Sequence, residues 1–108
     1  MKYTSTMLAL LSIAALSACS SVIIGQKEGS DHVSLANASQ VDNCQTKGKI
    51  NISVIAKIGR IPRVEEDVEA NLFQMARNNA VENGADTLVK GESKELGTRT
   101  FEMYKCRP

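Results

Sequence analysis

Residues 64–83 read VEEDVEANLFQMARNNAVEN, and this stretch decides which fold the chain can adopt. Apolar residues recur at intervals of three and four, at Val64, Val68, Leu72, Met75, Ala76 and Ala80. Phe73 and Val81 lie beside this series. This spacing gives a helix one apolar stripe. Acidic residues crowd the first turns, where the helix dipole favours negative charge, and Gly84 is placed to be a left-handed C-cap. The pattern predicts an amphipathic helix over residues 64–83.

Short strand patterns lie on both sides of this helix. Ile50, Ile52 and Val54 alternate with polar residues, which is typical of a half-buried strand. The predicted strands cover residues 33–36, 49–55, 87–90 and 100–106. The order β-β-α-β-β predicts an α+β fold, in which one helix packs on a small, mostly antiparallel sheet of about four strands.

The start of the chain has the pattern of a bacterial lipoprotein leader. Lys2 supplies positive charge, and residues 7–16 form a mostly apolar run that would extend roughly 15 Å as a helix. That length is too short to cross about 30 Å of hydrocarbon, so a processed signal is the natural interpretation. The run ends in Leu16-Ser17-Ala18-Cys19, which matches a lipobox with Cys19 as the acylated residue. The alternative is an ordinary signal peptide in which Cys19 is incidental.

These features predict three segments and a location. Residues 1–18 are expected to be the signal peptide, 19–32 a lipidated tether, and 33–108 a single periplasmic domain. Several acyl chains hold a protein durably to a membrane. Ser20 stands where an inner-membrane retention signal usually has Asp, so we expect an outer-membrane anchor with the domain facing the periplasm.

Composition excludes some classes of function. Without residues 1–18 the chain has 12 basic and 12 acidic residues, and the whole chain has no Trp, two Phe and two Tyr. A nucleic-acid-binding domain normally needs a strong basic excess, so no nucleic acid partner is expected. Gly91 and Gly97 flank a charged loop that matches neither common phosphate-binding fingerprint, and no cofactor is expected.

Cys44 and Cys106 lie near the two ends of the predicted domain. In an oxidising compartment such a pair is expected to form a structural disulfide. Closing a loop of about 60 residues stabilises a domain by roughly 4 kcal/mol in the chain-entropy model. Two free thiols or a redox-active pair are the alternatives, and the absence of C-x-x-C spacing disfavours redox activity.

Taken together, these features resemble a family of small bacterial lipoproteins that carries a domain-of-unknown-function label. The resemblance covers residues 33–108 and rests on the lipobox, the tether, Cys44-Gln45, Asn83-Gly84-Ala85-Asp86 and the closing Tyr104-Lys105-Cys106-Arg107-Pro108. The family is distantly similar to the outer-membrane stress-sensor lipoprotein of the Rcs phosphorelay. The resemblance implies a non-enzymatic α+β domain with Cys44 and Cys106 as half-cystines. The stress sensor has four domain cysteines where this chain has two.

Candidate catalytic and metal-binding groups are few. His32 is the only histidine and is expected to be solvated in the tether, away from any orienting partner. A zinc site needs about four suitable ligands, so no metal is expected. The acidic residues of the helix could be imagined to bind calcium or to act as an acid and base, but we expect them to serve the helix dipole. They are Glu65, Glu66, Asp67 and Glu69.

One basic run stands out between Cys44 and Val64, where five cations occur without an acidic residue: Lys47, Lys49, Lys57, Arg60 and Arg63. Such a run beside a membrane anchor could contact lipid or lipopolysaccharide phosphates. Neutralisation by neighbouring acids in the fold is the alternative. The sequence therefore favours a non-enzymatic outer-membrane lipoprotein that interacts with an envelope protein in envelope maintenance or stress sensing. The second hypothesis is a binding module for anionic envelope material, such as lipopolysaccharide or cell-wall polymer, through residues 47–63.

Overall fold

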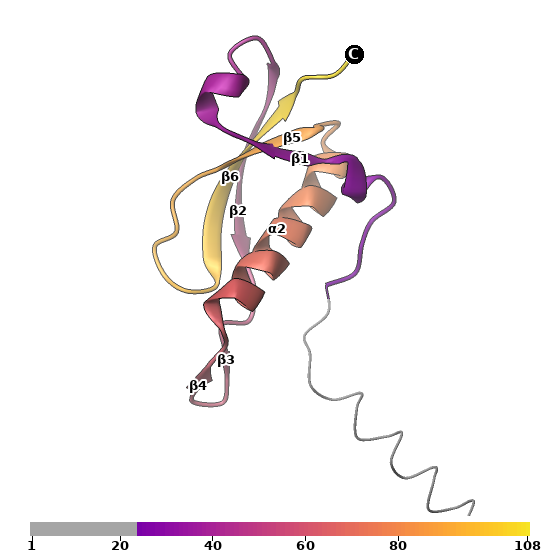
Figure 1. Cartoon of the computed structure of the whole chain (residues 1–108). Helices are drawn as coiled ribbons and strands as arrows, with labels where there is room; N and C mark the ends of the chain where they lie inside the picture. Colours follow the sequence, from indigo (N-terminus) through magenta and orange to yellow (C-terminus); the bar gives the residue numbers. More distant parts are fainter. Residues whose placement is uncertain (1–23) are drawn as a thin grey trace, which may run out of the picture.

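The computed structural model describes residues 24–108 (Figure 1). The predicted leader and Cys19 lie outside the described residues. The elements are β1 (Ser34–Ala36), β2 (Gln45–Ser53), β3 (Lys57–Ile58), β4 (Ile61–Pro62), α2 (Glu65–Glu82), β5 (Thr87–Lys90) and β6 (Thr98–Lys105), with 3-10 turns at Ser30–His32 and Ala38–Gln40. The predicted α+β class is confirmed.

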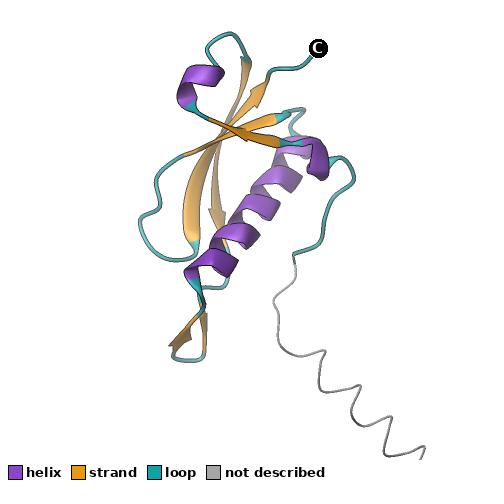
Figure 2. Cartoon of the chain, in the orientation of Figure 1, coloured by secondary structure: helices purple, strands orange, loops and turns teal. Residues whose placement is uncertain are grey.

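Four strands form the main sheet, in the order β1-β5-β6-β2, and α2 lies across one face of it (Figure 2). β6 pairs antiparallel with both β5 and β2, whereas β1 pairs parallel with β5. The sheet is thus mixed but mostly antiparallel. β3 and β4 form a separate two-stranded hairpin just before α2, which is not among the strands predicted from the sequence.

The core lies between α2 and the sheet. Val68, Leu72, Ala76 and Ala80 are fully buried on α2, as the apolar spacing predicted. They pack with the side chains of Ile52, Leu88, Phe101 and Met103 from three strands. Val64 differs from the prediction, because it precedes the helix as its N-cap residue and remains 65% exposed.

Gly84 ends the helix as predicted. Its φ of +70° is left-handed, a conformation that glycine adopts without a Cβ clash. The amide of Ala85 donates to the carbonyl of Ala80 at 2.8 Å, and the amide of Gly84 donates to Val81 at 3.2 Å. This pair of bonds is a Schellman motif, and burial of Ala80 and Ala85 together supplies its apolar contact.

The predicted disulfide between Cys44 and Cys106 is confirmed, with 4.5 Å between the two Cα atoms. Cys44 immediately precedes β2 and Cys106 immediately follows β6. Gln45 faces Lys105 as the last pair of the antiparallel ladder, so the disulfide is the next cross-link outward from it.

The folded region begins earlier than the predicted boundary at residue 33. The side-chain amide of Asn78 donates to the carbonyl of Gly25 at 2.7 Å and accepts from the backbone amide of Lys27 at 3.0 Å. Ser30 is only 2% exposed and its carbonyl accepts a hydrogen bond from Arg77. Residues 25–32, which the sequence assigned to the tether, are therefore attached to α2.

We expect Leu72→Ala to lower the free energy of unfolding by about 3 kcal/mol, because it removes apolar contacts and leaves a cavity in a closely packed core. Leu35→Ala is the matched control, since Leu35 lies on β1 and is 45% exposed. The control is expected to change stability by less than about 1 kcal/mol. Equal effects of the two substitutions in urea unfolding would contradict the described core.

Candidate functional site

The face of the sheet opposite α2 is polar. Successive side chains of β2 and β6 point to opposite faces of the sheet. Ile52 and Phe101 point towards the helix, so their neighbours within each strand point to the other side. Asn51 faces Thr100 in this polar row, and the Thr100 hydroxyl donates to the Asn51 Oδ1 at 3.1 Å. Among the described elements, α2 is the only long helix, and it lies on the other face (Figure 1). The polar face is therefore accessible.

This face contains a hollow of about 540 Å³, bounded on one side by the loop of residues 91–97. The lining combines side chains of both charges with neutral polar groups. The cations are Lys49, Lys94 and Arg99, and the acids are Glu92, Glu95 and Glu102. Lys49 Nζ lies 4.0 Å from Glu102 Oε1, and the Tyr104 hydroxyl donates to Glu102 at 2.8 Å. The hydrogen bond to this carboxylate raises the pKa of Tyr104.

Glycines hold the loop at both ends. The amide of Gly91 donates to Thr100 at 2.8 Å, and the carbonyl of Gly97 accepts from the amide of Val54 at 2.8 Å. A Cβ on Gly97 would lie 2.8 Å from the Cβ of Ala56, and the φ of Gly97 is +93°. Both the close approach and the left-handed backbone therefore require glycine at this position.

Arg99 connects the same loop to the helix. Its guanidinium donates twice to Glu69, at 2.9 Å each, and once to the carbonyl of Gly91 at 2.8 Å. These hydrogen bonds from Arg99 lower the pKa of Glu69, and burial opposes them. Glu69 thus serves a specific ion pair rather than the helix dipole alone, whereas Glu65, Glu66 and Asp67 do lie in the first turn.

The structure does not bring the five cations of the basic run together. Lys47 lies at a bulge in β2, and Lys49 on the polar face. Lys57 and Arg60 are exposed on the β3–β4 hairpin. Arg63 is a structural residue, because its guanidinium donates to the carbonyl of Ile55 and to Asn71 Oδ1, at 2.7 Å each. Cys44 and Cys106 form the disulfide, and Cys19 lies outside the described residues.

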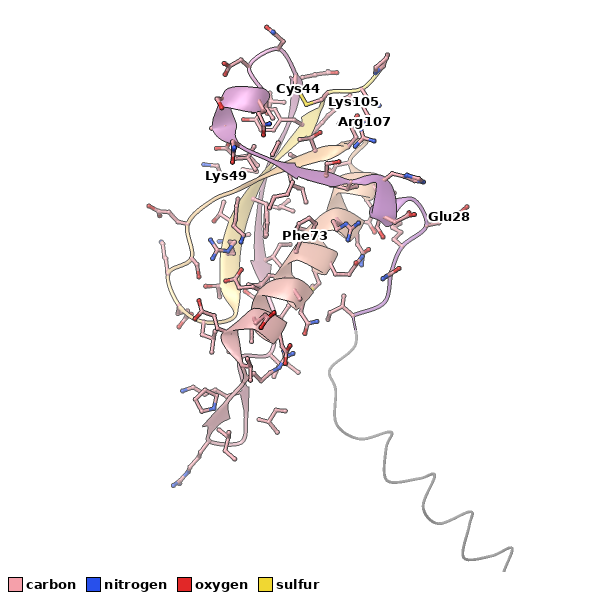
Figure 3. All side chains as sticks on the ribbon, in the orientation of Figure 1. Glu28, Cys44, Lys49, Phe73, Lys105 and Arg107 are labelled. Carbon is pink, nitrogen blue, oxygen red and sulfur yellow. A yellow bond between two sulfur atoms is a disulfide. The ribbon has the colours of Figure 1, made fainter. Side chains whose placement is uncertain are left out.

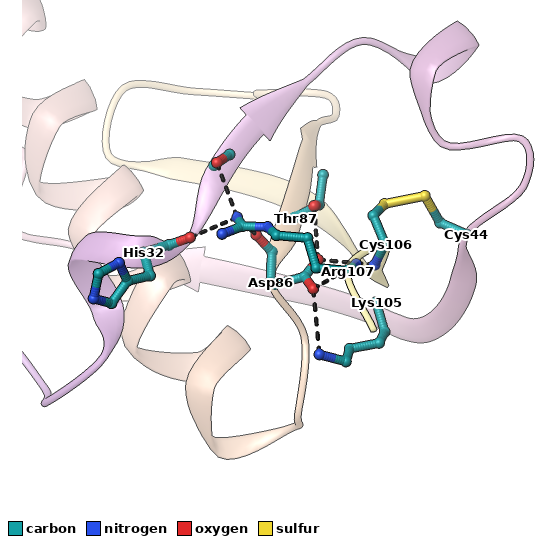
Figure 4. A network of polar contacts seen from close by, with 8 residues as sticks. His32, Cys44, Asp86, Thr87, Lys105, Cys106 and Arg107 are labelled. Carbon is teal, nitrogen blue, oxygen red and sulfur yellow. Dashed lines mark hydrogen bonds and ion pairs between the residues drawn. A yellow bond between two sulfur atoms is a disulfide. The ribbon is translucent and has the colours of Figure 1, made fainter.

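A second polar network surrounds Asp86, which was not predicted as a site residue from the sequence (Figure 4). One oxygen of Asp86 accepts from the Cys106 amide and the Thr87 hydroxyl at 2.8 Å, and the other accepts from the Arg107 amide at 2.9 Å. Lys105 Nζ lies 3.4 Å from Asp86 Oδ2. Asp86 therefore fixes the chain beside the disulfide. The sequence signals for Asp86 were its place directly after the helix-ending Gly84-Ala85 and its presence in the motif Asn83-Gly84-Ala85-Asp86.

Arg107 continues this network to the first strand. Its NH2 group donates to the carbonyl of His32 at 2.6 Å, the hydroxyl of Ser34 at 3.1 Å and the carbonyl of Asp86 at 3.1 Å. The end of the chain, the turn after α2 and β1 are thereby joined at one point. These contacts hold backbone groups in place, and the network is structural.

The described residues contain little that suggests metal chemistry. The side chain of His32 is 80% exposed, and its Nε2 lies 3.8 Å from Asp31 Oδ2. No group of three or more His, Cys, Asp or Glu side chains within residues 24–108 is placed to bind a metal ion. None of the helices in that range has the length and apolar content needed to span a membrane.

Comparison of the chain with protein-family models, curated proteins and solved structures found no match. The resemblance to the small lipoprotein family therefore remains a prediction from the residues.

Asp86 predicts a specific dependence of stability on pH. Burial opposes its ionisation, but the hydrogen bonds from Cys106, Arg107 and Thr87 outweigh this effect and lower the pKa of Asp86 from 3.8 to about 2. A lowered carboxyl pKa stabilises the fold above pH 4, and this contribution is lost as the pH falls towards 2. The loss is about 2 kcal/mol, by conversion of the pKa shift.

We expect Asp86→Asn to remove this dependence. In urea unfolding at pH 5 and pH 2, the variant should lose about 2 kcal/mol less than the wild type on acidification, and it should be less stable at pH 5. Asp42→Asn is the control, since Asp42 is exposed. If Asp86→Asn and the wild type lose the same stability between the two pH values, the assigned role of Asp86 is wrong.

Proposed function

We propose that this chain is a non-enzymatic, lipid-anchored protein of the bacterial outer membrane, whose domain faces the periplasm and binds an envelope protein in envelope maintenance or stress sensing. The observation that carries the protein-binding part is the accessible polar face of the sheet, with its hollow of about 540 Å³. The anchoring part rests on the lipobox at residues 16–19.

The charges of this face favour a protein partner. Three cations and three acids line the hollow, and one of the cations, Arg99, is paired with Glu69 of α2, so the electrostatic field of the hollow does not attract polyanions strongly. Surfaces with interspersed charges of both signs fit partners that present complementary charges, which gives specificity more than raw affinity. The basic run is less suited to a polyanion, since Arg63 is occupied within the fold and Lys49 lies near Glu102.

The exposed edge of the sheet adds a second means of recognition. β2 is a nine-residue edge strand that pairs only with β6 among the described strands. Edge strands present backbone groups that a partner strand can use. Lys47 and the bulge beside it interrupt one end of this edge, which leaves residues 48–53 as the regular part next to the hollow.

Acylation is tested by the mass of the protein purified from bacterial membranes. We expect a chain that begins at Cys19 and carries acyl chains on the sulfur and the amino group. Cys19→Ala should leave the protein without its acyl anchor and release it from the membrane fraction, because several acyl chains supply durable binding. A mature chain with an unmodified amino terminus would contradict the anchor.

The binding face is tested by photo-crosslinking in intact cells. A photoreactive residue at Asn51 is expected to give an adduct with one protein of defined mass. The matched control carries the same residue at Glu28, which is exposed near the start of the described chain, away from the polar face (Figure 3). Lys49→Glu should weaken the adduct at Asn51, because it reverses a charge of the hollow.

Equal adducts at Asn51 and Glu28, or none at Asn51, would contradict a specific binding face. The alternative function is distinguished by replacing Lys47, Lys49, Lys57 and Arg60 by Gln while keeping Arg63 for folding. Loss of lipopolysaccharide binding with an unchanged protein adduct would favour the module for anionic envelope material.

A further inference from the structure

The β3–β4 hairpin concentrates exposed apolar side chains. Of the large apolar residues that are exposed in residues 24–108, all except Leu35 lie in or beside this hairpin: Ile55 at 59%, Ile58 at 65%, Ile61 at 74% and Val64 at 65% exposure. Ile58 and Ile61 face each other across the two strands, on either side of the Gly59-Arg60 turn. The hairpin projects beyond the start of α2 (Figure 1). These side chains therefore lie outside the core and are available to another apolar medium.

The base of the hairpin is fixed. The amide of Arg63 donates to the carbonyl of Ala56 at 2.8 Å, and its guanidinium binds both Ile55 and Asn71. These bonds connect the hairpin to α2. The tip is thus held out from the domain with its isoleucines exposed, although folding back would reduce their contact with water.

The charges around the hairpin change sign between tip and base. Lys57 and Arg60 are exposed on the hairpin, and no acidic residue occurs between Cys44 and Val64. Three acids then begin α2 at the base, namely Glu65, Glu66 and Asp67. An apolar tip flanked by cations fits the headgroup region of an anionic bilayer, where long basic side chains reach the phosphates. The acids at the base oppose deeper entry and limit insertion to the tip.

The hairpin also lies near the place where the described chain begins. Ile24 lines an open hollow of about 430 Å³ together with Val54, Ile55 and Met75, at the base of the hairpin. Five residue steps separate Ile24 from Cys19, a reach of at most about 18 Å. An anchor at Cys19 therefore keeps this end of the domain close to the bilayer. This step rests on the acylation of Cys19 in the proposed function.

We propose that the β3–β4 hairpin is a second membrane contact. Ile58 and Ile61 enter the interfacial layer of an anionic bilayer, and Lys57 and Arg60 lie at its phosphates. One flexible lipid anchor leaves the orientation of a domain undetermined, whereas an anchor and an inserted hairpin define two points. The domain is then held with the hairpin towards the membrane, and the polar sheet face lies along its side.

The test uses the acylated protein in vesicles that contain anionic lipid. The chain has no tryptophan, so Ile61→Trp introduces a single fluorescent reporter at the tip. We expect its emission to shift to shorter wavelength and to be quenched by lipids brominated near the headgroup. Leu35→Trp is the matched control on β1, and its emission should remain that of a water-exposed residue without bromolipid quenching.

Charge variants test the cationic part of the contact. Lys57→Gln with Arg60→Gln should lower the ratio of inserted to free hairpin by roughly 25-fold, since each cation near an anionic surface contributes about fivefold. Both residues are exposed, so the fold is expected to persist, and thermal unfolding checks that it does. Raised salt should weaken insertion in the same direction.

The outcomes separate the hairpin contact from the acyl anchor and from contact with a second copy. Equal fluorescence of the two tryptophan proteins would overturn the proposal, and so would a shift of Ile61→Trp without bromolipid quenching, which would indicate contact with a second copy. The intact mass of the same sample reports acylation. An acylated protein with a water-exposed tip contradicts the hairpin contact alone, whereas an unacylated chain contradicts the proposed anchor.

Discussion

The pairing of β2 with β6 determines which side chains of both strands meet α2. A shift of one residue in this register would exchange the buried and exposed faces of β2. The bulge between Thr46 and Gly48 is part of the constraint, because it places one extra residue in β2. With this residue the Cys44–Cys106 disulfide can close one end of the ladder, while Ile50 pairs with Phe101 and packs against the core.

Asp86 and Arg107 reinforce this register at the end of the sheet. Asp86 accepts hydrogen bonds from the backbone amides of the two residues that follow β6, and Arg107 donates to Ser34 of β1. The disulfide and this network act on the same short segment from two sides (Figure 4). A small domain has a limited core, so such cross-links contribute a large share of its stability.

Two parts of the remaining surface differ in their chemistry. The sheet face opposite α2 carries balanced charge around a hollow, and the β3–β4 hairpin carries isoleucines between cations. Protein binding at the first and bilayer contact at the second are compatible, because the hairpin extends beyond the sheet and beyond the start of α2 (Figure 1). Glu69 and Arg99 couple α2 to the loop of the hollow, so the same helix supports both surfaces.

The local patterns of the sequence determined the helix, the existence of the four main strands and the pairing of the two domain cysteines. Val68, Leu72 and Ala76 are buried because their spacing matches the turn of a helix, and Ile52 because alternation matches a strand. Only the tertiary structure decided the strand order, the role of Asp86 and the separation of the basic run. Residues distant in sequence create these features, as when Asp86 binds Cys106 and Arg99 binds Glu69, and no local period encodes such contacts. The exposure of Ile58 and Ile61 has the same origin, since an apolar residue is buried only when the fold brings another element against it.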